Sequence, residues 1–190
     1  VHTLLGENGA GKSTLMNIIY GMYHPDSGAI RVKGRQWRFS SPRDAIAAGV
    51  GMVHQHFMLV PVLTVWENMI MGLPDLEAVL PRKTVIERIR ELSARYGLDV
   101  EPEAQVWQLS VGEQQRVEIL KMLYRKAQLL VLDEPTSVLT PQEVHHLFNT
   151  IRQMTAEGHG VVFISHKLDE VMEISDRITI LRKGEVVETL

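Results

Sequence analysis

Short apolar runs alternate with amphipathic segments at both ends of the chain, and this alternation predicts an α/β fold. Residues 1–5 (VHTLL), 129–133 (LLVLD) and 160–165 (GVVFIS) are almost continuously apolar, as expected of strands buried on both faces of a parallel sheet. A further strand is predicted in residues 49–55 (GVGMVHQ). The segments between these strands carry apolar residues at helical spacing. The sequence therefore predicts a parallel sheet covered by helices.

The first predicted helix follows residue 12, and its buried face is expected from the positions of its apolar residues. These recur three and four positions apart, at Leu15, Ile18, Ile19 and Met22. Such spacing places them on one side of a helix.

Two hairpins are predicted where strand-forming residues flank a glycine. Residues 29–39 (AIRVKGRQWRF) turn at Gly34, and residues 177–189 (RITILRKGEVVET) turn at Gly184. We expect the first hairpin to lie at the edge of the sheet. Trp37 is expected to pack against the protein there, and stacking on a nucleic-acid base is the alternative.

The middle of the chain is predicted to be helical. Thr64 with Glu67, and Ser110 with Glu113, have the spacing of capping boxes, in which two side chains satisfy the free N–H groups at a helix start. Between them, the helix over residues 83–96 carries its apolar face on Val85, Ile89, Leu92 and Tyr96. We expect one domain over residues 1–190, with an α/β core of 1–61 and 127–190 and an inserted helical subdomain of 62–126.

Composition limits the classes of function. A chain of 190 residues with 45% apolar residues can bury one sizeable core. The net charge of -3 without a Lys/Arg block argues against a nucleic-acid partner. No apolar run approaches the ~18 to 20 residues that span a bilayer, and the lack of cysteine excludes disulfides. Because the chain opens directly in a predicted strand, we expect it to be truncated at its N-terminus.

A phosphate-binding loop lies between the first predicted strand and the first predicted helix. Residues 6–14 (GENGAGKST) have the required spacing of two glycines followed by Lys and Ser. The glycines allow backbone N–H groups to approach an anion, while Lys12 can reach the outer phosphates and Ser13 can bind Mg²⁺. A nucleoside triphosphate is the predicted ligand. Its predicted contacts are Gly6, Glu7, Asn8, Gly9, Ala10, Gly11, Lys12, Ser13 and Thr14.

Two adjacent carboxylates end the strand over 129–133. Asp133 and Glu134 stand at its carboxyl end, where open α/β sheets place groups that contact ligands. We expect Asp133 to hold Mg²⁺, directly or through water, and Glu134 to orient and polarise an attacking water. Taken alone, the pair is equally consistent with a catalytic role and with two solvated carboxylates at a strand end. The phosphate loop favours the catalytic interpretation.

Further motifs make the chain resemble the ATPase subunits of ABC transporters. LSVGEQQ resembles their signature motif, LLVLDEP their Walker B segment, MVHQHF their Q-loop, SVLT their D-loop and ISHKLDEV the segment of their switch histidine. The order and spacing agree over essentially the whole chain. The resemblance implies a P-loop NTPase (RecA-like) fold, ATP and Mg²⁺ as ligands, and ATP hydrolysis.

The resemblance also implies roles for single residues. Gln55 and His166 join Glu134 as catalytic residues: Gln55 contacts the metal or the attacking water, and His166 hydrogen-bonds the γ-phosphate. The metal site comprises Ser13, Gln55 and Asp133. The signature residues act on ATP bound to a partner domain, and they are Leu109, Ser110, Val111, Gly112, Glu113 and Gln114.

The implied partners are a second ABC ATPase domain, in a homodimer or in tandem, transmembrane permease subunits at the cytoplasmic face of the membrane, and indirectly a substrate-binding protein. Phe57, Met58, Leu59 and Val60 are expected to form an apolar groove for a permease helix, with ordinary core packing as the alternative. Two departures from the family pattern stand out. Thr140 replaces the usual Asp of the D-loop, and the segment that supplies the adenine-stacking aromatic is not in the chain.

Within the family, residues 20–28 (YGMYHPDSG) and 53–72 (VHQHFMLVPVLTVWENMIMG) look like importers of simple sugars or nucleosides, in which two ATPase domains share one polypeptide. A soluble ABC-type ATPase with a mechanical or regulatory role is the alternative, although such proteins usually carry coiled-coil insertions or basic arms. A GTPase is a further alternative, but it would need an Asn-Lys-x-Asp motif to bind guanine, and the sequence contains none. A small-molecule kinase would leave the LSVGEQQ segment unexplained. The histidines show no zinc-site spacing.

Overall fold

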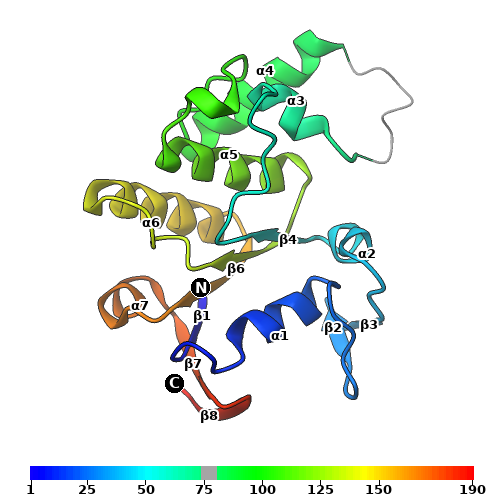
Figure 1. The fold of residues 1–190 in the computed structure, drawn as a ribbon, viewed down its shortest axis with the longest axis vertical. Coiled ribbons are helices and arrows are strands. Elements are labelled where there is room, and N and C mark those ends of the chain that lie inside the picture. Colours follow the sequence, from blue (N-terminus) through cyan, green and yellow to red (C-terminus); the bar gives the residue numbers. More distant parts are fainter. Residues whose placement is uncertain (74–80) are drawn as a thin grey trace.

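The computed structural model describes residues 1–73 and 81–190, and its centre is a six-stranded sheet (Figure 1). The strand order is β4 (Val50–Val53), β5 (Leu129–Asp133), β6 (Gly160–Ser165), β1 (His2–Leu5), β7 (Arg177–Arg182) and β8 (Glu185–Thr189). The first five run parallel, and β8 pairs antiparallel with β7 at one edge. The structure thus confirms the predicted parallel sheet with an antiparallel pair at its edge.

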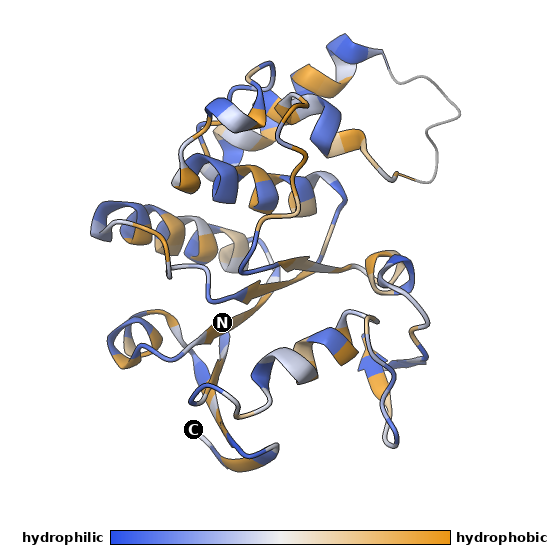
Figure 2. Ribbon diagram, viewed as in Figure 1, coloured by the Kyte–Doolittle hydropathy of each residue, from blue (hydrophilic) through white to orange (hydrophobic). Residues whose placement is uncertain are grey.

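Helices cover both faces of this sheet. They are α1 (Lys12–Ile19), α2 (Pro42–Ala47), α3 (Val65–Ile70), α4 (Arg82–Tyr96), α5 (Val111–Tyr124), α6 (Pro141–Ala156) and α7 (Leu168–Ile174), with a 3₁₀ turn η1 at Val106–Gln108. Figure 1 shows α5 and α6 on one side of the central strands and α1 on the other. In Figure 2 the central strands are strongly apolar, whereas the helices carry both apolar and polar stretches.

The two faces of the sheet belong to two separate apolar cores, because successive residues of a strand point to opposite sides. Leu130, Leu132 and Phe163 join the core formed with α3, α4, α5 and α6. Val131 and Ile164 join the core formed with α1 and α2. The helices between β4 and β5 therefore share one core with a sheet face. The division into a separate subdomain of residues 62–126 stays a prediction.

The predicted buried face of the first helix is wrong in part: Ile18 and Ile19 are half-buried, and Ile19 packs against the core, but the other two residues are exposed. Leu15 is 37% exposed, and Met22 is 51% exposed and lies beyond the end of α1. The buried residues are instead Lys12 and Met16, and the same stripe continues at Tyr20. The rotation of the helix is set by the loop before it, because the Lys12 amine donates to the carbonyl of Gly6 at 2.6 Å. Apolar spacing alone could not include a buried lysine.

The position predicted for the first hairpin is also wrong. Strands β2 (Ile30–Val32) and β3 (Arg35–Trp37) pair with each other in a separate two-stranded sheet. Trp37 packs beside Phe39 with ring centroids 5.9 Å apart, and the Arg35 guanidinium lies 4.7 Å from the Trp37 ring. Trp37 is thus used in packing, as expected.

Three helices begin with capping boxes of the same form. The backbone N–H groups of Thr64, Ser110 and Thr140 donate to a glutamate three residues later at 2.8, 2.7 and 2.9 Å. The hydroxyl of each cap in turn accepts a bond from that glutamate's N–H. These boxes fix where α3, α5 and α6 begin. Among the described helices, we find none with the length and apolarity to cross a membrane.

Candidate functional site

The carboxyl ends of four parallel strands meet around one pocket. Strand β1 leads into the phosphate loop, β4 into the segment of Gln55, β5 into Asp133 and Glu134, and β6 into His166. The pocket has a volume of ≈ 430 Å³ and is lined by Asn8, Gly9, Ala10, Gly11, Lys12, Ser13, Thr14, Gln55, Asp133, Glu134, Ser137 and His166. Gly6 and Glu7 line a neighbouring hollow of ≈ 800 Å³ along β7 and β8, which shares Asn8, Gly9, Ala10 and His166 with the pocket.

Two glycines are required by the path of the phosphate loop. Gly11, at the start of α1, has a φ of 101°, a left-handed conformation that residues with a Cβ rarely adopt. A Cβ on Gly6 would lie 2.5 Å from the carbonyl oxygen of Leu181 in β7. The turn after β7 also binds the loop directly, since the Gly184 N–H donates to the Ala10 carbonyl at 2.9 Å. The loop is thereby held against the β7–β8 pair.

The phosphate loop is suited to bind an anion. The Lys12 amine is buried and donates to the carbonyls of Gly6 at 2.6 Å and Glu7 at 3.1 Å. The free N–H groups at the start of α1 belong to the same loop, and a helix N-terminus carries a partial positive charge. Amine, amides and helix dipole are together suited to an anion such as a phosphate group.

The adjacent carboxylates Asp133 and Glu134 lie in different surroundings. Burial raises the pKa of Asp133, the Glu134 charge raises it further, and the nearby Lys12 charge opposes both effects. Glu134 adopts a φ of 49°, uncommon for a residue other than glycine. Its carboxylate oxygen Oε1 accepts a hydrogen bond from Nδ1 of His166 at 2.8 Å. Strain of this kind concentrates at functional sites.

The predicted metal ligands fit a magnesium ion in kind. Ser13, Gln55 and Asp133 all line the pocket and offer a hydroxyl, an amide and a carboxylate oxygen. Mg²⁺ prefers oxygen ligands, and it usually binds through one or two carboxylates together with phosphates and water. No cluster of three or more His, Asp or Glu suitable for a metal occurs in the part of the chain that is described. The donor set therefore fits a metal shared with a phosphate ligand.

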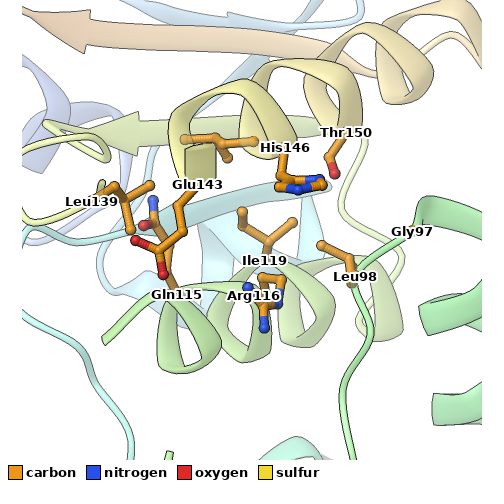
Figure 3. Close-up of a pocket in the computed structure, with 11 residues that line it drawn as sticks. Gly97, Leu98, Gln115, Arg116, Ile119, Leu139, Glu143, His146 and Thr150 are labelled. Carbon is orange, nitrogen blue, oxygen red and sulfur yellow. The ribbon is translucent and has the colours of Figure 1, made fainter. Parts of the chain in front are cut away.

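The predicted signature residues lie apart from this pocket. None of its described lining residues belongs to 109–114. The signature segment forms the start of α5, where Gly112 packs against α6: a Cβ on Gly112 would lie 2.0 Å from Oε1 of Glu143. Figure 3 shows Glu143 reaching from α6 toward Gln115 and Arg116 of α5. One chain thus carries both the pocket at the phosphate loop and a separate capped helix start.

The sequence analysis did not assign a role to several residues that line the pocket or support the segments around it. Ser137 lines the pocket, and buried Gln115 donates to the carbonyl of Pro135 at 2.6 Å, which joins α5 to the segment after Glu134. Glu170 accepts bonds from Thr136 at 2.5 Å and from Lys167 at 3.0 Å, which joins α7 to the segment after Glu134. The placement of Glu170 four residues after His166, on the helix that follows, was the available signal.

The expected apolar groove is present in part. A hollow of ≈ 370 Å³ is lined by Gln55, His56, Phe57, Leu59, Pro61, Val106, Trp107, Val111, Gln114 and Val138. Of the four residues expected there, Phe57 and Leu59 line it, while Met58 is 63% exposed and Val60 is half-buried. Leu59 also packs against the core, as the alternative interpretation expects, and a role of the hollow in binding a permease helix stays a prediction.

Comparison with known proteins finds similarity to the ATP-binding proteins of ABC transporters and of import systems. The ABC transporter family model matches residues 1–137. The chain is 49% identical to "Glucose import ATP-binding protein TsgD13" of Haloferax volcanii, covering 100% of the chain and 40% of that protein. It is 51% identical to "Nucleoside import ATP-binding protein NupA" of Lactococcus lactis, with 100% and 38% covered. It is 47% identical to "Ribose import ATP-binding protein RbsA" of Hahella chejuensis, with 98% and 38% covered. The chain thus spans about two fifths of these relatives.

Solved structures agree with the fold. The ADP conformation of MJ1267, an ATP-binding cassette of an ABC transporter, matches with a TM-score of 0.86 and 25% identity, covering 100% of this chain and 79% of that one. The dimeric structure of MJ0796, a bacterial ABC transporter cassette, matches with a TM-score of 0.83, 24% identity and coverage of 100% and 84%. The solved structures support the fold, and the family model over residues 1–137 shows that the chain belongs to the ABC transporter family.

Proposed function

We propose that the chain binds and hydrolyses ATP at the pocket of the phosphate loop. The observation that carries this proposal is the meeting of that loop with Gln55, Asp133, Glu134 and His166 around one pocket. Lys12 and the amides at the start of α1 would hold the outer phosphates. The hollow along β7 and β8 is continuous with the loop and offers space for the base and sugar.

Ser13, Asp133 and Gln55 would hold Mg²⁺, which when bound neutralises negative charge on the phosphates. The raised pKa of Asp133 is expected to fall when a cation lies beside it, because an opposite charge favours the ionised form.

Glu134 would orient the attacking water and accept its proton. Its carboxylate is only 12% exposed and is held by Nδ1 of His166, at 2.8 Å. With Nδ1 donating to the carboxylate, Nε2 is the ring nitrogen left to face the γ-phosphate, and it donates a hydrogen bond to phosphate oxygens only when it also carries a proton. Placement of such a base contributes about 10² to 10⁴ in rate, so turnover is expected to depend strongly on Glu134.

A second ATPase domain would complete the site. The Ser110 cap, the N–H groups of the first turn and the dipole of α5 are donors that suit a phosphate, yet they lie outside the pocket of their own chain. They would contact ATP held by the partner domain, either an identical copy or a tandem domain. The dimeric form of the MJ0796 cassette supports this arrangement.

We further propose that this ATPase drives import of a simple sugar or nucleoside through permease subunits, at the cytoplasmic face of the membrane, with a substrate-binding protein acting indirectly. The names of the relatives, which refer to glucose, nucleoside and ribose import, favour this over a soluble mechanical or regulatory ATPase. The hollow that Phe57 and Leu59 help to line would receive a permease segment.

Uptake assays test the transport proposal. In cells lacking the complete gene, uptake of labelled ribose, glucose and guanosine is measured with the unaltered gene and with Glu134→Gln restored. The proposal predicts that one solute is taken up only with the unaltered gene. Equal uptake of all three solutes with and without the gene would refute a role in their import, while ATP hydrolysis by the purified protein would still be testable separately.

A further inference from the structure

Two side chains of α5 hydrogen-bond the backbone N–H and the backbone carbonyl of Met58. Oε1 of Glu118 accepts a hydrogen bond from the Met58 N–H at 2.7 Å. The Lys121 amine donates to the Met58 carbonyl oxygen at 3.2 Å. Glu118 and Lys121 are three residues apart in a helix and therefore lie on the same face. Two side chains of one helical turn thus hold both polar groups of a single residue.

Both of these side chains are deeply buried. Glu118 is 2% exposed and Lys121 is 8% exposed, while the Met58 side chain points to solvent, the residue being 63% exposed. Burial raises the pKa of Glu118 and lowers that of Lys121, and the attraction between the two charges opposes each shift. The Arg125 charge lowers the pKa of both groups. Burying charges is unfavourable unless they are paired and hydrogen-bonded, and here the pairing is made around one backbone segment.

A second attachment lies two residues further on. Fully buried Asn68 of α3 accepts from the Val60 N–H at 2.8 Å and donates to the Val60 carbonyl at 3.2 Å. The chain between the two attachments is therefore fixed to α5 and α3. Only His56 and Phe57 separate the first attachment from Gln55, which lines the nucleotide pocket.

We propose that Glu118 and Lys121 are positioning residues that set the place of Gln55 in the nucleotide pocket. The helix that carries them begins at the Ser110 cap, so one rigid element joins the surface offered to a partner domain with the segment of Gln55. A displacement of α5 is passed to Gln55 through the Met58 backbone. This inference rests on the proposed role of Gln55 in hydrolysis.

A double-mutant cycle in the complete polypeptide, assembled with its partner domain, tests the inference. The variants are Glu118→Ala, Gln55→Ala and the pair. Glu118→Ala leaves the Met58 N–H without its partner, and we expect kcat to fall about tenfold while the Kd for ATP changes less than about twofold. Because Glu118 acts through Gln55, the double variant should be no slower than Gln55→Ala alone.

Further variants separate positioning from folding. Glu118→Gln retains an acceptor oxygen for the Met58 N–H and should restore most of the turnover. Lys121→Met keeps the aliphatic part of the side chain, loses the bond to the Met58 carbonyl and should lower kcat in the same way. This variant replaces Glu118→Ala in the test if Glu118→Ala does not fold. Exposed Glu87 of α4 provides the control, since Glu87→Ala should leave kcat unchanged.

The outcomes distinguish a failure of the proposed role of Gln55 from a failure of the proposed positioning by Glu118 and Lys121. If Gln55→Ala hydrolyses ATP at the parent rate, the proposed role of Gln55 is wrong and the inference fails with it. If Gln55→Ala is slow and the effects of Glu118→Ala and Gln55→Ala multiply in the double variant, the inference is overturned while the proposed function stands. A double variant as slow as Gln55→Ala, with Glu118→Gln near the parent rate, supports it.

Discussion

The contact between the starts of α5 and α6 yields a prediction of defined size. In Gly112→Ala the new methyl group would lie 2.0 Å from Oε1 and 2.7 Å from Cδ of Glu143, both closer than the 3.0 Å below which Cβ atoms essentially never approach another group. The Glu143 carboxylate must therefore move. It accepts bonds from the Thr140 N–H at 2.9 Å and from the Thr140 hydroxyl at 2.8 Å, so its displacement opens the capping box of α6.

Two opposing effects set the change in the free energy of unfolding of Gly112→Ala. Loss of a capping interaction costs about 1 kcal/mol. Replacing glycine by alanine in a helix returns up to about 1 kcal/mol. The free energy of unfolding should therefore change by less than about 1 kcal/mol, which for a domain of this size shifts Tm by no more than about 4 °C. The local effect is larger: the Thr140 amide should exchange about fivefold faster or more, because its acceptor is lost.

Hydrogen exchange and thermal unfolding check this prediction. The double variant Gly112→Ala/Glu143→Ala removes the obstructing carboxylate, so it should be no less stable than Glu143→Ala alone. Val111→Ala, at the exposed preceding position, is the control and should leave Thr140 exchange unchanged. Unchanged Thr140 exchange in Gly112→Ala, or effects of the two substitutions that simply add, would refute the described contact.

Three further predictions concern the nucleotide. Lys12→Ala should weaken ATP binding about tenfold or more, since a charged donor to phosphate is lost; calorimetry showing unchanged affinity would contradict its phosphate role. Ser110→Arg should leave ATP affinity intact but abolish ATP-dependent closure with the partner domain, measured by scattering, and normal turnover would argue against action across the interface. Because burial and the Glu134 charge raise the pKa of Asp133, protons should compete with Mg²⁺ at higher pH than for an exposed aspartate. Mg²⁺ affinity should then rise with pH through that raised pKa, whereas Asp133→Asn should bind weakly at all pH values.

Most of the fold could be predicted because local signals and topology agree. The apolar runs at β5 and β6 have few alternatives to buried parallel strands, and the capping boxes mark helix starts by short-range spacing. The position of the pocket could also be predicted, from the topology of the sheet. Parallel strands bring their carboxyl ends together, so residues far apart in sequence, such as Lys12, Glu134 and His166, meet at one edge of the sheet.

What could not be predicted depends on contacts between distant segments. The rotation of α1 is set by the buried amine of Lys12, which a hydrophobic pattern counts as exposed. Strands β2 and β3 were expected at the edge of the sheet, but β8 occupies the edge beside β7. From the sequence, Glu118 and Lys121 are expected to be surface charges, because the backbone groups that they bond lie about sixty residues earlier, at Met58.

The central claim is that Glu134 acts on the water that cleaves ATP held in this pocket. The most direct measurement compares ATP affinity and single-turnover hydrolysis for the unaltered protein and for Glu134→Gln, assembled with the partner domain. The account predicts an unchanged Kd for ATP and a rate of cleavage lower by about 10² to 10⁴. Cleavage by Glu134→Gln at the unaltered rate would contradict it.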